Sequence, residues 1–286
     1  MHNNQGNICA INIRGSENVK ELKYKLTNDL LFKMLFVKYP DLLKRLVAEL
    51  LEIIYDDIEQ FSITNPEMPP ETLGDKFCRL DINMIVDGQR IDLEIQVENE
   101  GNYPERSLFI WAKEFSSALK EGENYAELPK TIIISILGFN QFSDSTEFHS
   151  EFGALEVKRF TPLSDKFCLH FFELKKLPPL AKAGSGKELW LSLFNAKTEE
   201  DLAIIEAMEV PIMSTALQAY RHVAASDEFK ERERMRSKAR HDEAQALRNA
   251  QRQRDEHWQG IVNTKDATLA EQAAIIAELQ ALLDKK

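Results

Sequence analysis

The order of the expected elements predicts a mixed α/β domain, in which helices cover a sheet, followed by an α-helical extension. Apolar residues at helical spacing over 27–57 precede a hairpin-like segment of alternating residues at 79–98, and another helix is expected to begin at Pro104. Short apolar runs follow this helix, as in the strands of a covered sheet. The periodicity is helical again from about residue 188, and residues 227–259 are charged and contain no glycine.

Two helices are expected near the start of the chain. The first is predicted over 27–38, with Thr27 or Asn28 as its N-cap, because both side chains can accept a hydrogen bond from the first turn. Pro40 suits the first position of a second helix, which the apolar spacing continues to Asp57.

The later apolar runs predict the strands of the sheet. The run over 131–139 is short and rich in isoleucine, which favours a buried central strand. It follows the helix predicted from Pro104 to about Lys120, before Gly122. Residues 155–160 and 167–174 are interpreted as the strands that come next.

These patterns divide the chain into four parts. Residues 1–22 are expected to be a polar tail, 23–180 the α/β domain and 181–225 a helical subdomain. Residues 226–286 are expected to form a long charged helix and then a short, heptad-like helix.

Apolar residues recur every seven positions near the C-terminus, at Leu269, Ile276 and Leu283. This spacing is typical of a coiled coil, although it spans little more than two heptads. It therefore suggests a homodimer formed through the C-terminal helices.

The composition limits the class of protein. A net charge of −11 argues against a protein that simply coats DNA. Residues 230–254 hold nine basic and four acidic residues, so only a local patch would meet phosphate.

The cysteines and apolar runs predict a cytoplasmic protein. The three cysteines are far apart and form no CxxC motif, as expected in a reducing compartment. We expect no signal peptide and no membrane partner, because no apolar run approaches the ~20 residues of a membrane span. The six histidines include no close pair at metal-ligand spacing, so we do not expect a His/Cys zinc site.

The segment RLDINMIVDGQRIDLEIQ, residues 79–96, predicts a β-hairpin with one apolar and one acidic face. Asp87-Gly88 is a strong signal for a two-residue turn, which would place Asp81 opposite Glu94. A four-residue turn would instead pair Asp81 with Gln96, and the acids share one face in both registers.

Two carboxylates on neighbouring strands repel each other unless a cation lies between them, since cross-strand Cβ atoms are only ~5 Å apart. Mg²⁺ would remove this conflict, with Asp81 and Glu94 as ligands and the carbonyl of Ile95 as a plausible third. The alternative is that the acids only keep a half-exposed hairpin in solution, and Asp92, with Glu98 and Glu100, is expected to do so.

The motif D-x12-E-x-Q, from Asp81 through Glu94 to Gln96, resembles the active-site hairpin of the PD-(D/E)XK nuclease superfamily. More narrowly, the chain resembles the Rpn-type branch of this superfamily, which contains recombination-promoting nucleases and transposase-like proteins. The segments that carry the likeness occur in the same order over about 24–180: NDLLFKMLF, LDINMIVDGQRIDLEIQVEN, ERSLFIWAKEFSSALKEGENYAELPKTIIISIL and HFFELKKLP.

The resemblance implies a restriction-endonuclease-like fold and Mg²⁺-dependent hydrolysis of double-stranded DNA, with Mn²⁺ as a substitute, in recombination or transposition. Asp81 and Glu94 would hold the metal, and Gln96 stands where the wider superfamily has a lysine. An amide can orient water but carries no positive charge, which Lys33 or Lys113 could supply from a helix. Both lysines have the alternative of a solvated surface position.

Further residues are candidates with alternatives. Asp29 corresponds to an extra acid that the superfamily often places on its first helix, or it only favours the positive helix N-terminus. Basic residues on three predicted helices could contact DNA, or could be solvated surface charges: Lys33, Arg106, Lys113, Lys120, Arg232, Arg236 and Arg240. The alternative function is a catalytically inactive DNA-binding or assembly protein that retains the nuclease fold.

Overall fold

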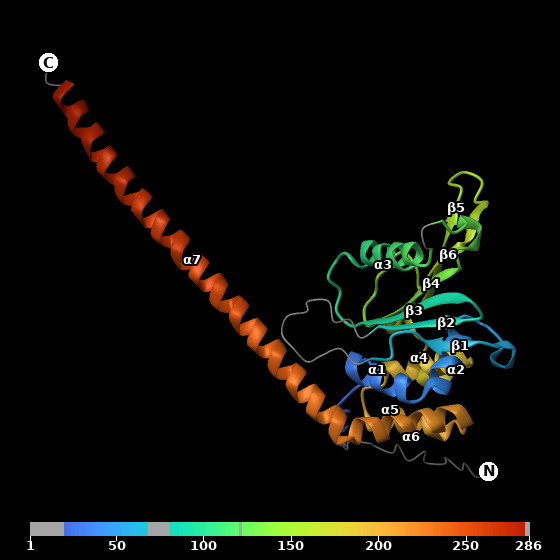
Figure 1. The fold of residues 1–286 in the computed structure, drawn as a ribbon. Coiled ribbons are helices and arrows are strands. Elements are labelled where there is room, and N and C mark those ends of the chain that lie inside the picture. Colours follow the sequence, from blue (N-terminus) through green and yellow to red (C-terminus); the bar gives the residue numbers. More distant parts are fainter. Residues whose placement is uncertain (1–19, 68–80, 120–121, 284–286) are drawn as a thin grey trace, which may run out of the picture. The chain divides into compact units, whose positions relative to one another are not determined.

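The computed structural model describes residues 20–67, 81–119 and 122–283 (Figure 1). The chain divides into a compact unit that runs through Phe229 and a second unit that contains the rest of the C-terminal helix.

The compact unit is built on a six-stranded mixed sheet, which confirms the predicted fold class. The strand order is β1-β2-β3-β4-β6-β5. Strands β3, β4 and β6 are parallel to one another, whereas β1–β2, β2–β3 and β5–β6 are antiparallel. The strands are β1 (Phe61–Ile63), β2 (Ile82–Val86), β3 (Gln89–Gln96), β4 (Thr131–Leu137), β5 (His149–Leu155) and β6 (Pro162–Glu173).

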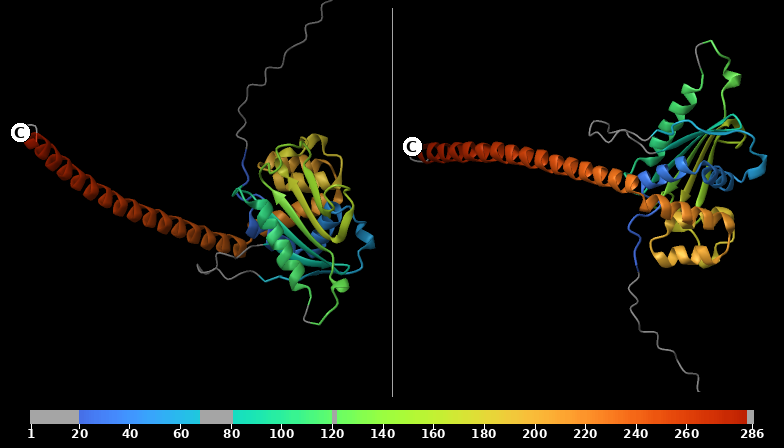
Figure 2. Two further views of the ribbon diagram at one scale, coloured as in Figure 1. Left: turned by 90° about the horizontal axis from the view of Figure 1, so that it is seen from above. Right: turned by 60° about the horizontal axis from the view of Figure 1, so that its bottom comes forward.

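Helices cover both faces of the sheet. The views in Figures 1 and 2 place α3 on one face and α1, α2 and α4–α6 on the other. The α-helices are α1 (Asp29–Lys38), α2 (Pro40–Leu50), α3 (Tyr103–Ser117), α4 (Gly186–Asn195), α5 (Glu199–Ala207), α6 (Pro211–Ala225) and α7 (Asp227–Leu283). Short 3-10 turns are η1 (Tyr55–Asp57), η2 (Tyr125–Glu127), η3 (Leu174–Lys176) and η4 (Leu180–Lys182).

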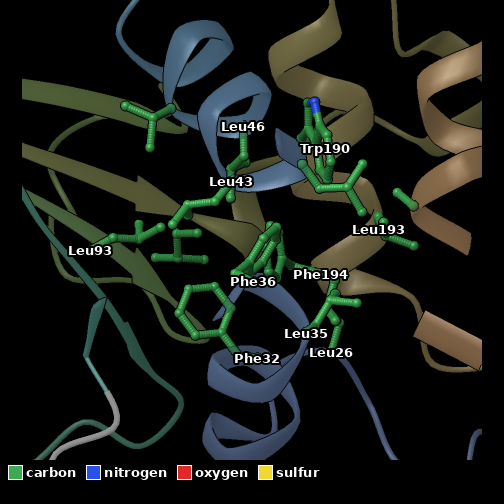
Figure 3. Close-up of a cluster of buried hydrophobic side chains, with 14 of the residues drawn as sticks. Leu26, Phe32, Leu35, Phe36, Leu43, Leu46, Leu93, Trp190, Leu193 and Phe194 are labelled. Atoms are coloured by element: carbon green, nitrogen blue, oxygen red, sulfur yellow. The ribbon is translucent and has the colours of Figure 1, made fainter. Parts of the chain in front are cut away.

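The larger core lies between the sheet and the helices α1, α2 and α4–α6 (Figure 3). Phe32 and Phe36 from α1 meet edge to face at 5.0 Å between ring centroids, and Phe194 of α4 packs on both. Trp190 and Leu93 belong to the same buried cluster. Helices α4–α6 therefore share one core with the α/β domain, and the predicted division at 180/181 does not coincide with a break in packing.

The smaller core lies under α3. Tyr103 and Ile110 of α3 pack on Ile133, Leu137 and Phe171 of the two central strands. Strand β4 is buried along its whole length, as predicted from its isoleucine run, because both of its faces are covered.

The prediction of a strand over 155–160 is wrong, because these residues mostly form the turn between β5 and β6. The Glu156 carboxylate accepts hydrogen bonds from the backbone N–H groups of Lys158 and Arg159, at 3.0 and 2.5 Å. Phe160 adopts a left-handed φ of 55°. Local bonds of this kind favour a turn over an extended strand, and the strand itself, β5, lies just before them.

The second helix ends earlier than the predicted Asp57. Glu52 adopts a left-handed φ of 56°, and the N–H of Ile53 bonds to the carbonyl of Ala48 at 2.8 Å. This geometry closes the helix at its C-terminus. The short edge strand β1, which follows, was not predicted from the sequence.

The first helix begins as predicted, with Asn28 as its cap. The Asn28 side chain accepts a hydrogen bond from the N–H of Leu31 at 2.9 Å. The segment before it is held by the last helices, because the N–H of Leu22 bonds to the carbonyl of Lys197 and the Tyr220 hydroxyl bonds to the carbonyl of Tyr24. Most of the tail predicted over 1–22 lies outside the described residues.

Helix α7 is one continuous helix of 57 residues, so the predicted break between a long helix and a short one is wrong. Only Gly260 interrupts its helix-forming sequence, and one interior glycine costs about 1 kcal/mol. Its first turn belongs to the compact unit, since Phe229 is buried edge to face against Tyr24 at 4.9 Å. Among the described residues, no helix combines the length and apolar character needed to cross a bilayer.

Candidate active site

The hairpin of β2 and β3 has the two-residue turn. Asp87 and Gly88 adopt φ values of 47° and 78°, as a type I′ turn requires. Asn83 pairs with Asp92 and Ile82 with Leu93, which excludes the four-residue turn. Continued by one residue, this register places Asp81 opposite Glu94.

The acidic face of the hairpin is covered by α3. Asp92 and Glu94 are each only 4% exposed. The interpretation of Asp92 as a solvent acid is therefore wrong, whereas Glu98 and Glu100 are exposed as expected. A carboxylate is rarely buried without partners, so the surroundings of Glu94 define its chemistry.

Tyr103, at the start of α3, orients the Glu94 carboxylate. Its hydroxyl lies 3.0 Å from Glu94 Oε2 and 3.0 Å from Ser135 Oγ. An ionised carboxylate only accepts, so Tyr103 donates to Glu94 and can accept from Ser135. Burial, with the charge of Glu94, raises the pKa of Tyr103 well above its usual value, and the phenol keeps its proton.

Arg106 binds the other oxygen of Glu94. Its guanidinium forms an ion pair with Glu94 Oε1 and donates to Gln96 Oε1 at 3.2 Å. The Gln96 amide nitrogen in turn donates to the carbonyl of Glu98 at 2.9 Å. The Glu94 carboxylate is thus held between a phenol and a guanidinium, and Gln96 is fixed beside it.

The candidate basic residues of α3 lie in different environments. Arg106 is turned toward Glu94 with its side chain 18% exposed, whereas Lys113 is exposed. Lys120 lies outside the described residues. The alternative that Arg106 is a solvated surface charge is therefore wrong, because ion pairing draws its guanidinium to a buried acid.

Lys33 belongs to helix α1 and not to α3, and it is buried, at 2% exposed. Its ammonium donates to the backbone carbonyl of Asp81 at 3.2 Å, and Asn65 Nδ2 donates to the same carbonyl at 3.1 Å. Asn65 Oδ1 also accepts from the N–H of Asn83 at 2.8 Å. Lys33 is thus not a surface lysine, and it reaches the backbone of one predicted metal ligand.

Asp29 and Ile95 occupy the expected elements. Asp29 is the first residue of α1, one turn before Lys33, and its Oδ1 accepts from the N–H of Leu30 at 2.9 Å. Ile95 lies in β3 beyond the residues that pair with β2. Their roles as extra acid and carbonyl ligand stay predictions.

Tyr103 and Asn65 were not predicted as site residues, and the role of Arg106 was different. One signal for Tyr103 and Arg106 exists in the sequence, because residues three apart on a helix share a face. Asn65 offered no such signal, since it lies in the loop after a strand that the sequence does not show.

A second polar cluster, which the sequence did not predict, lies between β5 and β6. His149 Nε2 is 3.0 Å from His170 Nδ1, and His170 Nε2 is 3.1 Å from Cys168 Sγ. Burial lowers the pKa of His170 to about 4 and raises the pKa of the Cys168 thiol to about 12. His149 and His170 are far apart in the sequence, where we expected no close histidine pair. They are nevertheless close in space, because the pairing of β5 with β6 brings them together.

This cluster predicts that acid lowers the stability of the fold. The ordinary pKa of a histidine, near 6.5, applies to His170 in the unfolded chain. Between pH 6.5 and 4 the unfolded chain therefore binds a proton that the folded chain excludes, and the free energy of unfolding falls by about 3 kcal/mol as the pH drops through this window. His149, Glu151, Cys168, Lys130 and Lys187 are the titratable neighbours of His170.

Denaturant unfolding in a chelator, from pH 4 to 7, measures this loss for the wild type and for His170→Gln. The variant should lose less stability over the same window, because its side chain does not titrate. Parallel curves for the two proteins would contradict the assignment to His170.

A mixed sheet covered by helices, with a buried carboxylate on its hairpin, is consistent with an α/β fold of the nuclease type. Residues 26–250 match the family described as PD-(D/E)XK nuclease family transposase, and the chain belongs to this family. No curated protein and no solved structure matched the chain.

Proposed function

We propose that this protein is a divalent-metal-dependent endonuclease that hydrolyses phosphodiester bonds of double-stranded DNA, in recombination or in the movement of DNA elements. One observation carries the proposal. The hairpin pairs Ile82 with Leu93, a register that would set Asp81 opposite Glu94 if it continued by one residue, and Glu94 is buried on β3 in an ion pair with Arg106.

The donor set fits Mg²⁺, with Mn²⁺ as a substitute, because hard oxygen ligands suit both ions. Asp81 and Glu94 would hold the ion, with the carbonyl of Ile95. A bound ion would supply Lewis acidity and lower the pKa of its water.

The protein's own groups then have separate tasks. Tyr103 holds the Glu94 carboxylate in one orientation, because its protonated hydroxyl donates to Oε2. The Gln96 amide, next to Glu94 on the same face, can orient the attacking water but carries no positive charge. Lys33 carries the nearest described lysine ammonium to the Asp81 backbone, so we assign the missing positive charge to it.

Plasmid nicking tests the proposal. We expect the wild type to nick supercoiled DNA with Mg²⁺ or Mn²⁺ and not in a chelator, and Asp81→Asn to lose this activity. Glu98→Gln is the matched control, because Glu98 is an exposed acid of the same segment. Equal rates for the wild type and Asp81→Asn would show that the site is wrong.

Variants of Lys33 and Lys113 distinguish a lysine that takes part in the reaction from one that only adds surface charge. Lys33→Met is expected to lower the nicking rate about 100-fold, since it removes a charge beside the site. Lys113→Met removes an exposed charge and should change the rate by less than a few fold. Lys33→Arg, which keeps the charge, should retain more activity than Lys33→Met, and identical losses in both would point to packing instead.

One observation favours the second candidate function, a catalytically inactive DNA-binding or assembly protein. The guanidinium of Arg106 already neutralises Glu94. If this pair is permanent, the hairpin does not take up a metal ion and the fold serves only binding. Salt-sensitive DNA binding without turnover would identify this function.

The charges of α7 are largely interspersed. Arg234 pairs with Glu231 at 2.7 Å and Arg240 with Glu233 at 2.8 Å. Such pairing is typical of a solvated spacer helix. We still propose that Arg232, Arg236 and Arg240 contact DNA. The test compares the salt dependence of DNA affinity between Arg236→Gln and the wild type, because each lost phosphate contact makes this dependence less steep.

We also propose a homodimer formed through the last turns of α7. Leu269, Ile276 and Leu283 are each more than half exposed in the single chain, at seven-residue spacing. Pairing with a second copy would bury this stripe. In sedimentation the intact chain should have twice the monomer mass, whereas a chain that ends at Gln259 keeps the compact unit and should be monomeric. A monomeric intact chain would end this proposal.

A further inference from the structure

We propose a second metal site, for a thiophilic transition metal such as Zn²⁺, between strands β5 and β6. Its ligands are Glu151, Cys168 and His170. This site is independent of the nuclease chemistry, because it uses other strands and another face of the sheet.

The strand pairing brings the three ligands together. Glu151 on the edge strand β5 lies directly opposite His170 on β6. Cys168 is two residues before His170, so both side chains point to the same face of β6. Residues far apart in sequence thus converge on one face at the edge of the sheet.

The ligand atoms lie close to the separations of a tetrahedral zinc site. Cys168 Sγ lies 3.1 Å from His170 Nε2 and 3.5 Å from Glu151 Oε1. Metal–ligand bonds of about 2.0–2.3 Å at tetrahedral angles separate ligand atoms by about 3.3–3.8 Å. The three ligand atoms all lie within 4.8 Å of one another, so small side-chain movements would close the site.

His149 positions the histidine ligand. Its Nε2 is 3.0 Å from His170 Nδ1. Coordination through His170 Nε2 requires the proton on Nδ1, and His149 Nε2 can accept that proton in a hydrogen bond. A partner on the second ring nitrogen is the usual companion of a metal-binding histidine.

The ligand chemistry selects the metal. A thiolate and an imidazole favour Zn²⁺, Co²⁺ or Cu²⁺ over Mg²⁺, whereas the carboxylates of the hairpin favour Mg²⁺. Cys168 and His170 are buried, and Glu151 is exposed. Three protein ligands leave the fourth position to water or an external ligand at the open edge.

The two sites lie on opposite faces of the sheet. Glu94 is in register with Ser135, and Ser135 with Phe171, so these three residues face α3. His170 is the neighbour of Phe171 on β6 and faces the other way, as Cys168 does in the larger core. Binding at one site can therefore be lost without direct loss of the other.

Metal binding to the full-length, chelator-treated protein tests the inference. We expect one Zn²⁺ per chain in competition with a chromophoric chelator, and Co²⁺ should give a sulfur-to-metal charge-transfer band. Cys168→Ser should abolish the band and weaken binding more than about 100-fold, because loss of an outer partner alone costs 10- to 100-fold. His149→Gln should weaken binding by about 10- to 100-fold and keep the band.

Controls separate the site from folding and from the hairpin. Cys9→Ser is the matched cysteine control, and Glu94→Gln leaves the cluster intact, so both should bind Zn²⁺ like the wild type. Glu151→Gln changes an exposed ligand and should fold normally by circular dichroism while binding more weakly. The inference is overturned if the folded wild type does not bind stoichiometrically, if Cys168→Ser binds as tightly, or if Glu94→Gln abolishes binding.

Discussion

Replacement of Glu94 by glutamine is expected to lower metal-dependent plasmid nicking by about a hundred- to a thousandfold. The amide has nearly the shape of the carboxylate but carries no negative charge, so it cannot hold a divalent ion against water. Loss of one group that stabilises transition-state charge is typically worth this factor. The rate, measured at saturating Mg²⁺ and again at saturating Mn²⁺, gives the size of the effect.

The structure adds a condition to this experiment. Glu94 accepts from Tyr103 and pairs with Arg106, and glutamine can keep the first contact but loses the charge for the second. Melting curves of Glu94→Gln at the assay pH must therefore show a folded protein. Glu98→Gln, from the exposed end of the same segment, should nick like the wild type. Nicking by folded Glu94→Gln at the wild-type rate would remove Glu94 from the site.

The hairpin was predictable in detail because it depends on local signals. Alternating apolar residues define its buried face, and Asp87-Gly88 sets the turn that brings Asp81 opposite Glu94. Strand β4 was predictable for a similar reason, since an isoleucine run of this length suits only a buried strand or helix.

The burial of the acidic face could not be predicted, because it depends on where a distant helix packs. The sequence shows that α3 is amphipathic but not which strands it covers. Only the fold reveals that Tyr103 and Arg106 bind Glu94 and that Asp92 is buried. The same limit applies to Lys33, whose burial depends on the packing of α1 against the sheet.

Strand β5 shows a second limit. As an edge strand it is half exposed and mixes polar and small residues, so it lacks the apolar pattern of a buried strand. The following residues contain Leu155, Val157 and Phe160, which imitate a strand although they form a turn. Because β5 was misplaced, its pairing with β6 and the His149–His170 contact could not be foreseen.

Arg106→Met is expected to lower the free energy of unfolding by about 3 kcal/mol in the absence of divalent ions. The Arg106 side chain is 18% and that of Glu94 6% exposed, and removal of one partner leaves a buried charge without compensation. Arg45→Met is the matched control. Its pair with Asp41 at 3.2 Å is exposed, and such pairs contribute at most about 1 kcal/mol.

The response of this variant to divalent ions distinguishes the two candidate functions. If the hairpin is a metal site, Mg²⁺ or Mn²⁺ can replace the lost guanidinium charge, and an ion at a hundred times its dissociation constant would restore about 2.7 kcal/mol. The wild type should gain less, because the ion must compete with Arg106 for Glu94. Chemical denaturation over a series of ion concentrations measures both gains. If the ions stabilise Arg106→Met no more than Arg45→Met, the Glu94–Arg106 pair is a permanent part of the fold, and the hairpin serves DNA binding or assembly without cleavage.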